Sequence, residues 1–139
     1  MVEIKRGELT VEQFSKLVES VGWNVPPKGQ LELALKQSFC TVLILEGETA
    51  VAMGRMIGDS GLAYFIRDVV VHPNNQGKGY GRLVVNELLS VVNSYTPVGG
   101  YACVELMSSS GKEVFYEKLG FKTLDAINGA SGMQIRVEK

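Results

Sequence analysis

The sequence predicts a mixed α/β fold, in which helices flank a sheet that is largely antiparallel. Three apolar, β-branched segments follow one another at 39–46, 49–57 and 62–71. Only short, turn-rich connectors separate them, which is typical of antiparallel hairpins. The third segment is joined to a strand at 101–107 through a helix at 81–95, and such a crossover makes the two strands parallel. The expected sheet is therefore antiparallel with one parallel pair.

The elements before these strands are also visible in the pattern. Residues 2–6 alternate in polarity and predict a short strand. Thr10 and Gln13 have the spacing of a capping box, and apolar residues at helical spacing follow them. Gly22 ends this helix. A second short helix is expected at 30–38, after a loop that contains two prolines.

The C-terminal part predicts one more helix and one more strand. Ser110 and Glu113 have the spacing of a second capping box, at the start of a helix over 112–119. Gly120 occupies the position of a left-handed C-terminal cap. A last strand is expected at 133–138.

Length and composition favour one globular domain that spans residues 1–139. The apolar fraction is 45% and the charged fraction is 21%, so an intrinsically disordered chain is excluded. A formal net charge of −1 provides no electrostatic footprint for nucleic acid. The N-terminus has no apolar segment of the signal-peptide kind, and no apolar run is long enough to span a membrane. The simplest interpretation is a cytoplasmic protein that binds neither nucleic acid nor membranes.

The sequence contains two cysteines, Cys40 and Cys103, and each lies inside an apolar strand segment. Small buried residues are the expected interpretation, rather than a disulfide or a catalytic nucleophile.

The most informative stretch is "VHPNNQGKGYGR" at residues 71–82, where a strand meets a helix. The first N–H groups of a helix lack internal partners, and glycines let an anion approach them closely. The stretch is not a Walker A loop, because neither Gly-Lys pair precedes Ser or Thr. It is not a clean Rossmann fingerprint, because Arg82 stands where the third glycine belongs.

Counted from Gln76, the same loop is Q-x-x-G-x-G, with Gly79 and Gly81 as its glycines. This pattern, the segment "FYEKLGF" at 115–121 and the order of the elements resemble the GNAT superfamily of N-acetyltransferases. The resemblance implies a GNAT-type acyl-CoA N-acyltransferase fold with a splayed parallel strand pair. It also implies acetyl-CoA as cosubstrate, no metal, and a primary amine of a small molecule as acceptor. A peptide amine is the less favoured acceptor, and the homodimers of many relatives leave a dimer open.

The resemblance also assigns the cofactor site. The strand residues Val69, Val70 and Val71 would bind the pantetheine arm through their backbone groups, as an added strand does. One N–H of this segment would polarise the thioester carbonyl. The positions implied for the pyrophosphate are Gln76, Gly77, Lys78, Gly79, Gly81 and Arg82.

Tyr116 corresponds to the family's tyrosine near the CoA sulfur, where a phenol can protonate the departing thiolate. An ordinary packed aromatic is the alternative. Asp68 interrupts an apolar strand and is the preferred general base, while a structural acceptor at a β-bulge is the alternative. Glu105, His72 and water are the other base candidates.

Arg55 and Asp59 either position the acceptor or brace a hairpin. A CoA-binding module without turnover is the competing function. It would bind acetyl-CoA but acetylate no amine.

Overall fold

The structure is a computed structural model that describes residues 1–128, and it divides into two compact units, Met1–Leu106 and Met107–Lys139. Each unit is described by itself. The first unit contains a sheet of five strands in the order β1-β2-β3-β4-β5. The strands are β1 (Val2–Arg6), β2 (Cys40–Glu46), β3 (Thr49–Gly58), β4 (Ala63–Val71) and β5 (Cys103–Leu106).

Strand directions agree with the sequence prediction. The first four strands pair antiparallel with their neighbours, and β4 pairs parallel with β5. Helix α3 (Tyr80–Tyr95) forms the crossover between the two parallel strands. The predicted mixed sheet with one parallel pair is therefore confirmed.

The other helices of the first unit are α1 (Val11–Ser20), α2 (Lys28–Gln37) and the 3-10 turn η1 (Pro73–Asn75). The predicted capping box at the start of α1 is present. The Gln13 N–H donates to Thr10 Oγ1 at 3.2 Å, and the Thr10 N–H donates to Gln13 Oε1 at 3.0 Å. None of the helices within residues 1–128 combines the length and the apolarity that crossing a bilayer demands.

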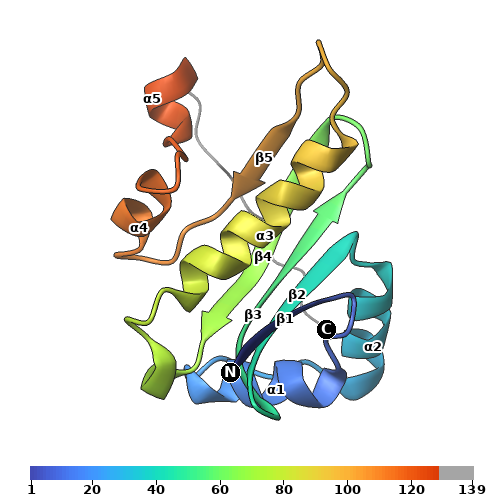
Figure 1. Cartoon of the computed structure of the whole chain (residues 1–139), viewed down its shortest axis with the longest axis vertical. Helices are drawn as coiled ribbons and strands as arrows, with labels where there is room; N and C mark the ends of the chain where they lie inside the picture. Colours follow the sequence, from blue (N-terminus) through green and yellow to red (C-terminus); the bar gives the residue numbers. More distant parts are fainter. Residues whose placement is uncertain (129–139) are drawn as a thin grey trace. The chain divides into compact units, whose positions relative to one another are not determined.

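Two apolar layers cover the two faces of the sheet. Helices α1 and α2 pack on one face, where Phe14, Leu17 and Leu31 contact a cluster that includes Met53 and Val70. Helix α3 runs across the other face (Figure 1) and contacts β2, β3 and β4. Each fully buried Leu, Val or Met side chain contributes roughly 1.5–3 kcal/mol relative to exposure.

Close packing under α3 explains one glycine of the sheet. A Cβ atom at Gly54 of β3 would lie 2.5 Å from Val84 Cγ1 and 3.4 Å from Leu88 Cδ1, and both of these side chains are fully buried. A larger residue would force α3 away from β3. The absence of a side chain at Gly54 therefore allows α3 to pack closely against β3, the strand that pairs with β4.

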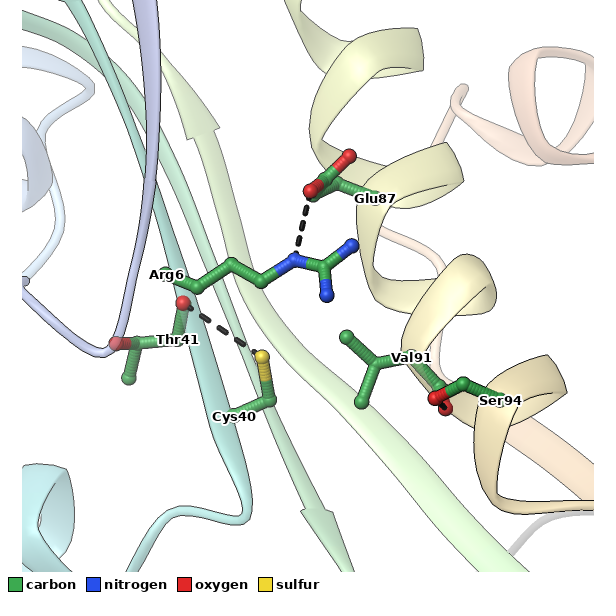
Figure 2. A network of polar contacts seen from close by, with 6 residues as sticks. All are labelled: Arg6, Cys40, Thr41, Glu87, Val91 and Ser94. Carbon is green, nitrogen blue, oxygen red and sulfur yellow. Dashed lines mark hydrogen bonds and ion pairs between the residues drawn. The ribbon is translucent and has the colours of Figure 1, made fainter.

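An ion pair also joins α3 to the edge strand β1. Arg6 Nε donates to Glu87 Oε1 at 2.7 Å (Figure 2), although the Arg6 side chain is half exposed. Such a surface pair contributes about 0.2–1 kcal/mol, so apolar burial rather than this contact holds α3 on the sheet.

The second unit contains α4 (Glu113–Glu117) and the unpredicted α5 (Leu124–Asn128). The predicted cap at Gly120 is confirmed, because Gly120 has a φ of +98° and its N–H donates to Glu117 O at 3.0 Å. The Phe121 N–H donates to Tyr116 O at 3.1 Å, which completes a Schellman motif. The expected strand at 133–138 lies outside the described residues.

The second capping box was a wrong prediction. The N-cap of α4 is Lys112, and it has no side-chain capping bond. Gly111 adopts a φ of +84°, and the Lys112 N–H donates to Ser109 O at 3.0 Å in a turn. A left-handed residue cannot belong to the first turn of a helix, so α4 begins too late for Ser110 to cap it.

Candidate active site

The parallel strands β4 and β5 separate halfway along β4. Their pairing runs from Ala63 opposite Cys103 to Ile66 opposite Leu106. The rest of β4, residues 67–71, pairs only with β3 within the part of the chain that the structure describes. This edge of β4 therefore has backbone groups available for an extended ligand, as the splayed pair predicted.

The orientation of this edge follows from one hydrogen bond. The His72 N–H donates to Val51 O of β3 at 2.8 Å. Because backbone groups alternate between the two sides of a strand, those of Val71 point away from β3. Val69 and Val71 are partly exposed, whereas Val70 is buried in the core. On that side Val71 O accepts from Gln76 Nε2, so the Val71 N–H is the group left for a ligand, while the Val70 side chain anchors the strand.

The glycine loop connects this strand to α3. Gly77 and Gly79 have φ values of +81° and +86°, and Gly79 is the N-cap of α3. A Cβ atom at either glycine would meet no atom within 4 Å, so the glycines leave open space above the loop. None of the described residues accepts a hydrogen bond from the backbone N–H groups of Gly77 through Arg82. These N–H groups, at the positive end of a long helix, can bind an anion.

Gln76 braces the loop rather than leaving its own groups free. Its Nε2 donates to Val71 O at 3.1 Å, and its N–H donates to Pro73 O at 3.4 Å. The side chain therefore holds the glycine loop to the end of β4. This contact links the predicted pyrophosphate position to the predicted pantetheine edge.

The two cations of the loop differ in their surroundings. Lys78 Nζ donates to Glu46 Oε1 at 3.1 Å, and the Tyr80 hydroxyl donates to the same oxygen. These bonds, with Tyr80 the larger cause, hold the pKa of Glu46 below its usual value. Arg82 is exposed and pairs with no acid within residues 1–128. Arg82 is thus the loop cation that can turn to a phosphate without breaking an ion pair.

Sequence reasoning missed Glu46. It lies 32 residues before Lys78, and only the fold brings the end of β2 to the start of α3. The one signal in the sequence is a carboxylate at the end of an otherwise apolar strand.

Asp68 lies at an irregularity of β4 and is already paired. Its φ is +54°, and the pairing of β3 with β4 shifts register at this point. Arg55 Nε donates to Asp68 Oδ2 at 2.5 Å, and both side chains are largely buried. The structure therefore places Asp68 as an acceptor at a β-bulge, which was the alternative to a general base.

Asp59 braces its hairpin. Its Oδ1 accepts the N–H groups of Gly61, Leu62 and Ala63 at 2.8, 2.8 and 3.1 Å. These bonds hold the pKa of Asp59 below its usual value. The bracing role, which was one of two expectations, is the one that the contacts support.

The other base candidates occupy different surroundings. His72 Nδ1 accepts the Asn74 N–H at 3.2 Å, so in the neutral ring the proton is on Nε2. Neither ring nitrogen then has a free lone pair to accept a proton from the amine. Glu105 is exposed on β5, opposite Phe65 of β4.

Tyr116 belongs to α4 of the second unit and is half-buried. Its ring makes edge contacts with Phe115 and Phe121, with centroid distances of 4.9 and 5.9 Å. Burial raises the pKa of the phenol. None of the described residues hydrogen bonds to its hydroxyl, so the phenol stays protonated and has a proton to donate.

The two cysteines differ in their surroundings. Cys40 is half-buried, and its Sγ lies 3.6 Å from Thr41 O, near Arg6 and Glu87 (Figure 2). Burial raises the pKa of its thiol, which lowers the thiolate fraction. Cys103 is exposed, which corrects the expectation of a buried residue. The reason is that β5 is the last strand of the sheet within residues 1–128, and its side chains alternate between exposed and half-buried positions.

Comparison with known proteins agrees with this geometry. The family model described as "Acetyltransferase (GNAT) domain" matches residues 37–123. The uncharacterized N-acetyltransferase ycf52 of Pyropia yezoensis is 29% identical over 126 residues, which cover 87% of this chain and 70% of the relative.

Two solved structures are similar to this fold. A GNAT family acetyltransferase of Streptococcus pneumoniae is 28% identical with a TM-score of 0.81, and the match covers 99% of this chain and 100% of that one. A protein of unknown function from meticillin-resistant Staphylococcus aureus is 26% identical with a TM-score of 0.85 at the same coverage. The chain therefore belongs to the GNAT family of acetyltransferases.

Proposed function

We propose that the protein transfers the acetyl group of acetyl-CoA to a primary amine of a small molecule, or, as the second choice, of a peptide. The observation that carries this proposal is the run of N–H groups from Gly77 to Arg82 that find no acceptor within residues 1–128, which follows shortly after the part of β4 that pairs with β3 alone among those residues. An anion site beside an unpaired strand edge fits a ligand that joins a pyrophosphate to an amide-containing arm.

The residues of the site fit the two halves of acetyl-CoA. The N–H groups of the glycine loop would bind the pyrophosphate, with Arg82 adding positive charge. The open space above Gly77 and Gly79 leaves room for the phosphates. The edge of Val69 to Val71 would pair with the pantetheine amides, as a further strand would.

Acetyl-CoA supplies an activated carbonyl and a thiol leaving group. The amine attacks the carbonyl carbon, a C–N bond forms, the C–S bond breaks, and the sulfur leaves as a thiolate. An N–H of the β4 edge would stabilise the charge that develops on the carbonyl oxygen. Tyr116 would give its proton to the sulfur, and its raised pKa keeps that proton in place at neutral pH. Since the Cys40 pKa is raised and neither cysteine belongs to the glycine loop or to the segment 115–121, we propose direct attack in a ternary complex. This role for Tyr116 requires residues 1–139 to act as one catalytic domain.

The identity of the base that takes the amine proton stays a prediction. Arg55 holds Oδ2 of Asp68, so Asp68 would have to act through Oδ1. Glu105 and water are the alternatives, and the bond at His72 Nδ1 makes that side chain the weakest of the candidates.

An amine panel tests the proposal. The protein is mixed with acetyl-CoA and a panel of small primary amines and short peptides, CoA thiol release is followed, and products are identified by mass. Amine-dependent release with an acetylated product supports the proposal. Acetyl-CoA binding by calorimetry without turnover on the panel would favour the CoA-binding module. An absence of acetyl-CoA binding would contradict both.

A further inference from the structure

Asp68 has an unusual backbone conformation for its position. Among the described residues other than glycine, only Ser60 and Asp68 have a positive φ. Ser60 lies in the turn between β3 and β4, where such conformations are common. Asp68 lies inside β4, where a residue with a Cβ atom pays for a left-handed conformation. Something must therefore hold it there.

The conformation coincides with a bulge. Met53 pairs with Val70 and Arg55 pairs with Arg67, so Asp68 and Val69 together lie opposite Gly54. The extra residue re-aims the part of the strand that follows it. That part is the free edge from Val69 to Val71.

A chain of polar contacts fixes the bulge. Arg55 is next to Gly54 on β3, and its Nε donates to Asp68 Oδ2 at 2.5 Å. Its Nη1 donates to Ser38 Oγ at 3.5 Å, just before β2 begins. The side chains of Arg55 and Asp68 are 16% and 17% exposed, so water competes weakly for either group. The ion pair thus connects the left-handed residue of β4 to β3, the central strand of the described sheet.

We propose that Arg55 and Asp68 are positioning residues, and that their ion pair holds the left-handed bulge that aims the N–H groups of the β4 edge at the acyl group. This inference rests on the proposed function, because it names what sets the direction of that edge. It assigns no proton transfer to Asp68. The carboxylate is needed because it anchors a conformation that the chain would otherwise leave.

Variants at these two positions separate anchoring from base catalysis. Glycine adopts a positive φ without strain and needs no anchor, so Asp68→Gly keeps the bulge, whereas Asp68→Ala does not. We expect Asp68→Ala and Arg55→Met to lose roughly 10- to 100-fold in kcat, because an oxyanion donor is misaimed, and Asp68→Gly to keep a kcat several-fold higher than that of Asp68→Ala. The double variant Arg55→Met/Asp68→Gly should likewise be several-fold more active than Arg55→Met alone. The Kd of acetyl-CoA should change less than kcat, since the glycine loop is untouched.

A second readout does not depend on turnover. The backbone amide NMR signals of Val70 and Val71 in the free protein should lie closer to those of the wild type in Asp68→Gly than in Asp68→Ala and Arg55→Met. Melting temperatures show that each variant is folded at the assay temperature.

Three outcomes would overturn the inference. Equal losses of kcat in Asp68→Gly and Asp68→Ala would make the carboxylate itself the catalytic group. If Asp68→Gly does not rescue Arg55→Met, the ion pair does not act by holding the bulge. Unmoved amide signals in Asp68→Ala would show that nothing needs anchoring. A failure of the proposed function looks different, since the wild type would then release no CoA with any amine of the panel, while the amide signals could still respond as expected.

Discussion

Gly79→Ala tests whether the start of α3 binds the pyrophosphate. Gly79 has a φ of +86°, and a Cβ atom would meet nothing within 4 Å, so the cost of alanine is backbone strain alone. A left-handed alanine costs about 1–2 kcal/mol, which lowers the melting temperature of a chain of this size by roughly 3–8 °C. Relief of that strain turns the N–H groups at the helix start away from the ligand. Loss of one charge-assisted hydrogen bond costs about 1.5–3 kcal/mol. We therefore expect the Kd of acetyl-CoA to rise roughly 10- to 100-fold.

Gly99→Ala is the matched control. Gly99 has a φ of +84° and equally open space, but it lies in the turn after α3, at the other end of the helix. The two variants should lose similar stability in thermal unfolding, and only Gly79→Ala should lose affinity in calorimetry. The same affinity in both variants, whether unchanged or equally reduced, would refute the reasoning.

Three further predictions concern the acid and the cations. Tyr116→Phe should lower kcat at least 10-fold and change the Kd of acetyl-CoA less than threefold. The control Tyr95→Phe, at an exposed tyrosine of α3, should change neither value. Equal turnover in the two variants would show that Tyr116 is not the acid. Burial raises the pKa of Tyr116, so the acid form persists as pH rises, and the alkaline loss of kcat in steady-state kinetics should begin only above about pH 10. The raised pKa also makes a contribution to stability that is present below about pH 10 and is lost as pH rises through the folded pKa. A kcat that falls near pH 8 would contradict a buried phenol as the acid. Arg82→Ala should raise the Kd of acetyl-CoA about 5- to 10-fold and lessen its salt dependence, while Lys78→Ala, at a cation held by Glu46, should have the smaller effect; the reverse order would show that Lys78 leaves Glu46 for the phosphates.

The parts of the fold that local rules decide were predictable from the sequence. Thr10 and Gln13 satisfy each other within one helical turn, so their capping box could be predicted from spacing alone. Ser110 and Glu113 have the same spacing, but the left-handed Gly111 between them prevents the helix from starting at Ser110. The conformation of Gly111 depends on a turn that residue spacing does not predict.

The candidate site divides in the same way. The glycine loop is contiguous, so its position at the start of α3 followed from the order of the elements. The partners of its charged residues did not follow. Glu46 reaches Lys78 only because β2 ends near the start of α3, and Arg55 reaches Asp68 across a register shift of one residue. A bulge leaves little trace in a single sequence, apart from a carboxylate in an apolar strand.

A titration of isotope-labelled protein with acetyl-CoA, followed by amide NMR, tests the central claim most directly. We expect the largest shifts in the amides of Gly77 through Arg82 and along Val69 to Val71, and we expect pantetheine, which lacks the pyrophosphate, to move only the second group. Binding that leaves the amides of the glycine loop unmoved would contradict that claim.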